Sequence, residues 1–229
     1  MTGYIYDDAG RLVQTTTYAD AMPAGTTDIA GWTSTKTGLT MRSVYDDAHG
    51  GNLAYTIDAV GAVTGYIYDA NGAVTQKVAY AAQDTSTGPR LLADMSIAAG
   101  ADDRTTSYTH DANGNLTSVT DALGYVTRYT YDAYGYLAFV IDPAGDVTGY
   151  TYTSAGQVTK TTRYAAANTS TGIQSLGQMQ SWVTANANAG NDISTQAAYD
   201  AFGRATTTTD GNGYVTSNTY DAEAGFRPP

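Results

Sequence analysis

The sequence predicts an all-β protein, an antiparallel β-hairpin repeat meander with short helical or loop inserts. Three observations predict this fold. A unit of ten to eleven residues recurs along the chain, each unit carries an Asp-x-x-Gly turn sequence, and the segments between turns are rich in Tyr, Thr and Val. Repeat units bury their apolar faces only against their neighbours, so we expect one repeat array over residues 1–229.

The turn residues set the period of the array. Their steps alternate between ten and eleven residues, so the full period is 21 residues and holds two half-units. Asp in the first turn position and Gly where φ is positive predict a type I turn closed by a glycine bulge. An irregular copy at Asp46 and Asp47, with His49-Gly50-Gly51, predicts a bulge or a longer turn. The regular turn positions are Asp58, Asp69, Asp111, Asp121, Asp132, Asp142, Thr153, Asp200, Asp210 and Asp221.

The segments between turns are about six residues long, which corresponds to roughly 20 Å of strand. They are too close in sequence for a crossover helix, so successive strands should pair antiparallel. In residues 126–131 the alternation places Thr127, Tyr129 and Tyr131 on one face and the other three residues on the opposite face. Neither face is purely polar. We therefore expect one face to be covered, either by the sheet curling on itself or by the inserts.

Three inserts interrupt the array, at about residues 19–41, 81–104 and 165–194, and each begins after a Tyr-Ala pair. The third insert has apolar residues at near-helical spacing, which predicts a short amphipathic helix that caps the sheet. The second insert, with Leu91, Leu92 and Met95, has a weaker signal. The alternative is that the inserts are exposed loops. The helical residues of the third insert are Ile173, Leu176, Met179 and Val183, with Trp182 beside them.

Charge and composition exclude several classes of function. The formal net charge is −11, and the acids are aspartates apart from Glu223, which points to turns because Asp bonds its local backbone. The 11 Lys and Arg are scattered and form no basic stripe, so we expect no nucleic-acid partner. The chain has no Cys, which excludes disulfides and thiolate chemistry.

No apolar run is long enough to span a membrane and no signal peptide is present. Both ends, at Tyr4 and Tyr220, already lie inside repeats, so we expect a fragment of a longer protein.

The repeat phrases resemble a known family. Tyr-Asp-Ala-x-Gly resembles the YD repeat of the Rhs family, which includes bacterial Rhs proteins, the shell-forming subunits of insecticidal toxin complexes and the teneurins. The interleaved Asp-x-x-Gly-x-Val-Thr units are similar to the other half-repeat of that family. The resemblance covers about two thirds of the chain. The first phrase stands at Tyr68-Asp69, Tyr131-Asp132 and Tyr199-Asp200, and the second at Asp58, Asp121, Asp142 and Asp210.

The resemblance implies a curved or spiral strip of hairpins that can close as a hollow shell. It implies a secreted or cell-surface location, and partners that are the remaining repeats and a C-terminal toxin domain of a parent protein. Such shells often end in an autoproteolytic motif that begins Asp-Pro-x-Gly-Leu. Asp142-Pro143-Ala144-Gly145 is similar to its beginning, but Asp146 stands where Leu would be and the unit is in repeat register. We therefore interpret it as a turn with Pro in its second position.

No constellation in the sequence predicts catalysis. His49 and His110 lie beside turns, and His110 replaces a repeat Tyr, which is typical of surface drift rather than of a metal pair. Weak Ca²⁺ binding at Asp turns is a secondary alternative. We expect no enzyme activity, no cofactor and no dedicated metal site.

A binding role is the alternative to a structural one. Tyr has an apolar body and a polar tip, so exposed Tyr and the insert tryptophans Trp32 and Trp182 could contact a glycan or a surface protein. The bland alternative is that Tyr pairs stabilise the strip itself. Open strip ends also predict edge-to-edge self-association between copies.

Overall fold

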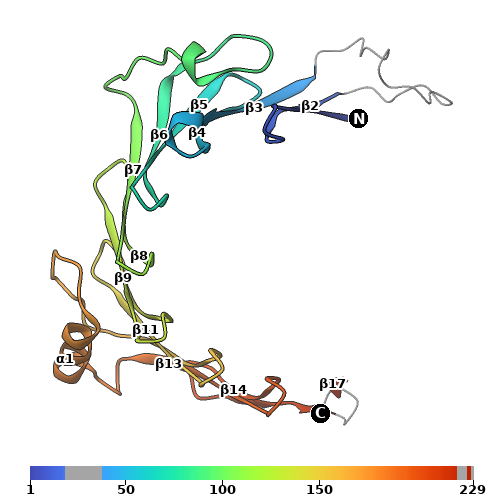
Figure 1. The fold of residues 1–229 in the computed structure, drawn as a ribbon. Helices are drawn as coiled ribbons and strands as arrows, with labels where there is room; N and C mark the ends of the chain where they lie inside the picture. The colour runs from blue at the N-terminus through green and yellow to red at the C-terminus, as the bar shows by residue number, and fades with distance from the viewer. Residues whose placement is uncertain (19–37, 221–225, 228–229) are drawn as a thin grey trace. The chain divides into compact units, whose positions relative to one another are not determined.

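The structure is a computed structural model that describes residues 1–18, 38–220 and 226–227. By its contacts the chain divides into two compact units, Met1–Ser107 (unit 1) and Tyr108–Pro229 (unit 2). Strands β1 to β15 follow one another in chain order in one open antiparallel sheet, which confirms the predicted meander (Figure 1). A short additional pair joins β16 (Thr219–Tyr220) to β17 (Phe226–Arg227).

Unit 1 is built from paired strands with the second insert beside them. A 3-10 turn, η1 (Asp47–His49), replaces the regular turn between β3 and β4, where the sequence predicted a bulge or longer turn. A second 3-10 turn, η2 (Leu92–Asp94), lies in the second insert. The strands are β1 (Thr2–Tyr6), β2 (Leu12–Thr17), β3 (Leu39–Asp46), β4 (Asn52–Ile57), β5 (Ala62–Tyr68), β6 (Val74–Gln83) and β7 (Arg104–His110), which continues into unit 2.

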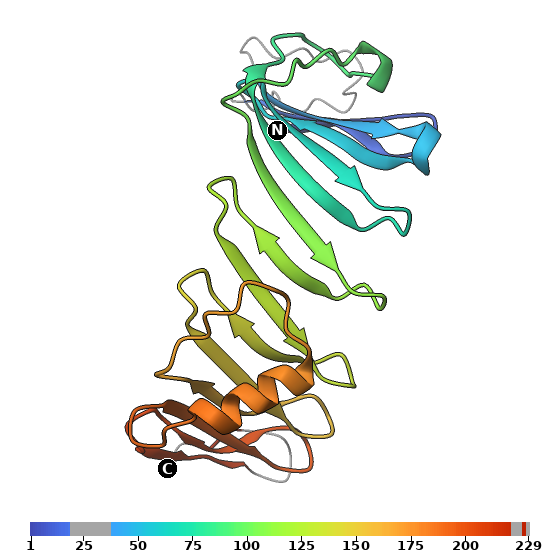
Figure 2. The ribbon, with the colours of Figure 1, turned by 90° about the vertical axis from the view of Figure 1, so that its left-hand side faces the viewer.

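Unit 2 repeats this plan and adds a helix. Figure 2 shows helix α1 (Leu176–Asn186) lying across the strands of this unit. Ser175 caps the helix by accepting a hydrogen bond from the Gln178 N–H, and the Gln178 side chain accepts one in return from the Ser175 N–H. The strands are β8 (Leu116–Thr120), β9 (Val126–Tyr131), β10 (Leu137–Ile141), β11 (Val147–Tyr152), β12 (Val158–Arg163), β13 (Ile193–Tyr199), β14 (Ala205–Thr209) and β15 (Val215–Ser217).

The hairpin turns have the predicted chemistry. At Asp132 the side-chain Oδ1 accepts hydrogen bonds from the backbone N–H groups of Tyr134 and Tyr136, both at 2.9 Å. Gly135 has a φ of +83°, a value that favours glycine. The pairing of β9 with β10 shifts register after this turn, as a glycine bulge requires. Thr153 replaces Asp and makes the same two contacts through Oγ1, both at 3.2 Å.

Each unit has its own small apolar core, and in each the inserted segment covers one face of the sheet. In unit 1, Val44, Ile57 and Val63 are buried beneath Leu92 and Met95 of the second insert. In unit 2, residues of β10 and β11 are buried beneath Met179 and Leu176 of α1. We expected one sheet face to be covered either by curling of the sheet or by the inserts, and within each unit the inserts cover it.

The three inserts differ from one another. The helix predicted in the third insert is present at residues 176–186. The second insert begins after β6 ends at Gln83, and the helical structure described in it is the 3-10 turn η2, which ends at Met95 in an extended conformation. Most of the first insert, including Trp32, lies outside the described residues.

Candidate functional site

The YD tyrosines bind each repeat to the one before it. The Tyr131 hydroxyl donates to the carbonyl oxygen of Leu116 at 3.0 Å, and the Tyr152 hydroxyl donates to that of Leu137 at 2.7 Å. Burial raises the pKa of both hydroxyls, helped by the neighbouring Tyr129 and Tyr150 respectively, so both stay protonated as donors. The same contact joins Tyr45 to Leu12, Tyr68 to Leu53, Tyr199 to Val158 and Tyr220 to Ala205.

In several turns the residue that follows the turn glycine contacts the next YD tyrosine. The Arg204 guanidinium pairs with Asp200 at 2.7 Å and lies 4.5 Å from the centre of the Tyr220 ring. In unit 1, Arg11 pairs with Asp7 at 2.7 Å and lies 4.6 Å from the centre of the Tyr45 ring. In the turn at Asp132 this position is Tyr136, whose ring lies 5.0 Å from that of Tyr152. The turn aspartates and YD tyrosines are therefore occupied by contacts within the repeat.

An 84-residue duplication relates the two units. Residues 80–88 (YAAQDTSTG) and 164–172 (YAAANTSTG) match at all but two positions. Their backbones dock alike: the Asp84 N–H donates to the Gly61 carbonyl at 2.9 Å, and the Asn168 N–H donates to the Gly145 carbonyl at 2.8 Å. A Cβ on Gly61 would lie 2.5 Å from the Asp84 carbonyl oxygen, so a glycine is needed for this approach.

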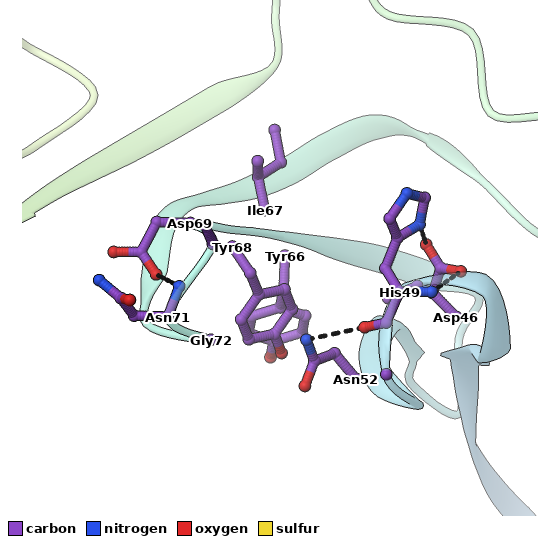
Figure 3. Close-up of a pocket in the computed structure, with 12 residues that line it drawn as sticks. Asp46, His49, Asn52, Tyr66, Ile67, Tyr68, Asp69, Asn71 and Gly72 are labelled. Atoms are coloured by element: carbon purple, nitrogen blue, oxygen red, sulfur yellow. Dashed lines mark hydrogen bonds and ion pairs between the residues drawn. The ribbon is translucent and has the colours of Figure 1, made fainter.

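A groove of about 820 Å³ lies beside two turns of unit 1 (Figure 3). It runs between the η1 turn and the turn at Asp69, over Tyr66 and Tyr68 of β5. His49 Nδ1 lies 2.7 Å from Asp46 Oδ2, and this hydrogen bond is the main cause that lowers the pKa of Asp46. The Asn52 side chain donates to the His49 carbonyl at 3.1 Å.

Unit 2 has a groove of about 670 Å³ at the corresponding place. Tyr150 and Tyr152 line it where Tyr66 and Tyr68, 84 residues earlier, line the groove of unit 1. Its other wall differs, because Tyr134 and Tyr136 stand in the places of Gly50 and Asn52 and residues of α1 close one side. We name these two sites the unit 1 groove and the unit 2 groove.

The residues selected from the sequence are not brought together at one site. Trp182 is half-buried, packs against the unit 2 core and lies edge-on to Tyr164 with ring centres 5.5 Å apart. His49 lines the unit 1 groove and His110 lies at the end of β7. Asp142 caps its own turn through bonds from the N–H groups of Ala144 and Asp146.

Two further findings concern only the described part of the chain. Within residues 1–18, 38–220 and 226–227, no three His, Cys, Asp or Glu side chains are grouped so that they could hold a metal ion. Over the same residues, no helix has the length and apolar character needed to cross a membrane.

The groove tyrosines Tyr134 and Tyr136 were not selected from the sequence. A signal was present there, because the turn at Asp132 carries an aromatic residue at both variable positions. Other turns carry one aromatic residue at these positions, as at Tyr125, Phe202 and Tyr214, or none, as the turn at Asp111 does.

Comparison with known proteins gives a family match and a fold match. Residues 96–122 and 110–138 match the RHS Repeat family model, and no curated protein matches the chain. A chain of the Photorhabdus luminescens Tc holotoxin pore with mutated TccC3 is similar over 97% of this chain, with 16% identity and a TM-score of 0.50. A chain of the TcdB2-TccC3-Cdc42 crystal structure is similar over 98% of this chain, with 16% identity and a TM-score of 0.36.

This chain spans 11% of the length of the first of these solved chains and 14% of the second. At this identity the holotoxin likeness concerns the fold. The RHS-repeat match and the similarity to the holotoxin chain both fall on the hairpin array with its Tyr-Asp turns. Together they confirm that this chain carries RHS repeats and resembles the Rhs/YD-repeat family.

Proposed function

We propose that the chain is a non-enzymatic structural segment of a larger secreted or cell-surface Rhs/YD-repeat protein. In that protein its hairpin strip forms part of the wall of a shell that encloses a C-terminal toxin domain. The other repeats and the toxin domain of the parent protein are its partners in this role.

One observation carries this proposal: the recurring side chains serve the repeat. The YD hydroxyls donate to carbonyl groups of the preceding repeat, and the turn carboxylates accept backbone N–H groups of their own turns. General acid or base catalysis needs a positioned group directed at a substrate. The similarity of fold to a Tc holotoxin chain supports a place in a large toxin assembly.

A binding module built on the insert tryptophans is the alternative. Trp182 gives it little support, because its ring packs on Tyr164 and on the core of unit 2. Trp32 lies outside the described residues, so that part of the alternative stays a prediction.

Protease protection of the C-terminal domain in the full-length parent protein tests the wall function. We expect the domain to resist cleavage in the parent and to be cleaved faster when Met179→Asp destabilises unit 2. Phe202→Ser, at a side chain that is 82% exposed on a turn, is the control and should leave protection unchanged. Equal cleavage rates in the parent and in Met179→Asp would contradict the proposal.

A further inference from the structure

The unit 2 groove presents a row of three aromatic rings. The ring centres of Tyr134 and Tyr136 lie 6.4 Å apart, and those of Tyr136 and Tyr152 lie 5.0 Å apart, with interplanar angles of 33° and 31°. Tyr136 packs over Gly156. A Cβ on Gly156 would lie 2.7 Å from the Tyr136 hydroxyl oxygen, so the ring needs a glycine beneath it. Tyr134 at the end of the row is 85% exposed.

The repeat does not explain why Tyr134 is aromatic. The turn at Asp132 uses only the backbone N–H of this residue, and Asn71 and Asn113 fill the same position in other turns. A large apolar side chain exposed at 85% gains little from folding. Val60, Leu123 and Phe202 are similarly exposed at this position of other turns, whereas Tyr134 extends a row of rings that reaches Tyr152.

The lining of the groove favours a neutral, hydroxyl-rich ligand. Gln180 and Thr184 of α1 and Ser154 line the groove together with the three tyrosines. Amide and hydroxyl groups donate and accept hydrogen bonds, which suits a polyhydroxyl ligand. Asp132 lines the groove but its Oδ1 accepts two N–H groups of its own turn, and neither Lys nor Arg lines the groove, so it offers no positive partner to an anionic ligand.

The unit 1 groove is the internal comparison. It keeps the two strand tyrosines, Tyr66 and Tyr68, but has Gly50 and Asn52 in place of the two turn tyrosines. It therefore lacks the aromatic row, although the backbone around it follows the same plan. The difference between the grooves lies in the groups that would touch a ligand.

We propose that the unit 2 groove binds a neutral saccharide chain, whose C–H faces stack on Tyr134, Tyr136 and Tyr152 and whose hydroxyls bond Gln180 and Thr184. Tyrosine combines an apolar ring face with a polar edge, which matches the two kinds of surface on a sugar ring. The groove volume of about 670 Å³ accepts a few sugar units. This activity goes beyond the wall function and does not depend on it.

Titration calorimetry of the 229-residue chain tests this proposal with five neutral probes: the hexasaccharides of cellulose, starch, xylan, mannan and chitin. We expect at least one to bind with a millimolar or lower dissociation constant. Tyr134→Ala should weaken binding about three- to tenfold, the value of one ring contact. Tyr134→Phe keeps the ring and should bind like the parent chain.

Phe202→Ala is the matched control, because Phe202 is similarly exposed at the same position of another turn and lies outside the groove. It should leave binding unchanged. Circular dichroism should show that all three variants are folded, since both side chains are exposed. The proposal is overturned if no hexasaccharide binds, or if Phe202→Ala weakens binding as much as Tyr134→Ala. Binding of a neutral aromatic hexapeptide but of no saccharide would also overturn it.

Discussion

The two units attach their inserts to the sheet with the same backbone hydrogen bond, but the side chains at the attachment are charged in unit 1 and uncharged in unit 2. In unit 1, Asp84 lies between Arg42 and Arg90, and the Arg42 guanidinium donates to the Ser86 carbonyl at 2.6 Å. The exposed fractions of the Asp84 and Arg42 side chains are 4% and 6%. Unit 2 has the neutral Asn168 at the corresponding place, and its side chain lies 3.6 Å from the sulfur of Met179.

The repeat therefore determines where each insert is attached, and the side chains determine what covers the sheet beyond that point. The hydrogen bond to the turn glycine fixes where each insert begins on the sheet, and it is common to both units. The side chains then select an ion cluster over unit 1 and an apolar helix over unit 2. Exchanging these groups between the units is a direct way to test the comparison.

Asn168→Asp should have the largest effect. The new carboxylate would be buried at a position only 3% exposed, without the arginines that surround Asp84. An uncompensated buried charge should lower the free energy of unfolding of unit 2 by about 3–5 kcal/mol at neutral pH. Hydrogen exchange of the β10 and β11 amides measures this loss, and exchange in β4 and β5 is the control. An unchanged rate in β10 and β11 would show that the site accepts charge.

Met179→Ala should be next in size. Met179 is fully buried, and its removal leaves a cavity between α1 and the sheet. We expect a loss of about 2–4 kcal/mol in unit 2. The matched variant is Met95→Ala, 84 residues earlier, which is only half-buried in unit 1 and should cost less. Denaturant unfolding in a Trp32→Phe background, followed by Trp182 fluorescence, measures the first loss. Equal losses for both variants would contradict the difference in burial between Met179 and Met95.

Asp84→Asn should destabilise unit 1 by about 1–3 kcal/mol, because the charge partner of Arg42 and Arg90 is removed while the shape is kept. The effect should depend on pH. Burial acts to raise the pKa of Asp84, but bonds from Ser86 and the charges of Arg90 and Arg42 outweigh it, so the pKa is lowered.

A carboxylate with a lowered pKa in the folded state stabilises the fold above its unfolded pKa. This contribution is lost as the pH falls through the folded pKa, below about pH 4. The difference in stability between the parent chain and Asp84→Asn should therefore shrink on acidification. Hydrogen exchange of β4 and β5 across this pH range measures it. If the stability difference between the parent chain and Asp84→Asn grew at low pH, the lowered pKa of Asp84 would be contradicted.

Tyr131→Phe should have the smallest effect. It removes the hydrogen bond to the Leu116 carbonyl and keeps the ring, so the expected loss is about 0.5–1.5 kcal/mol. Tyr129→Phe, two residues away on the same strand, is the control. Denaturant unfolding measures both losses. A loss for Tyr131→Phe no larger than that for Tyr129→Phe would show that this hydrogen bond does not hold the repeats together.

The sequence was sufficient to predict the turns, the antiparallel pairing and the helix of the third insert. These features depend on local rules: Asp132 and Gly135 determine their turn, and the spacing of Leu176, Met179 and Val183 determines a helix. The Tyr131–Leu116 contact was not predicted, because it depends on the register after a bulge. The paired grooves were missed for a related reason, since the 84-residue duplication becomes visible only when insert and strand residues are aligned together.

The tyrosine contacts also limit how such an array can lengthen or shorten during evolution. Each hydroxyl reaches a carbonyl fifteen residues earlier wherever no insert intervenes, as from Tyr68 to Leu53 and from Tyr220 to Ala205. Loss of one half-unit would reverse the direction of every later strand and leave a YD tyrosine hydroxyl without its carbonyl acceptor. Loss of a whole 21-residue period would restore each donor to an equivalent acceptor. Related chains should therefore differ in length by whole periods, and insertions should accumulate at strand ends, as they have after β6 and β12.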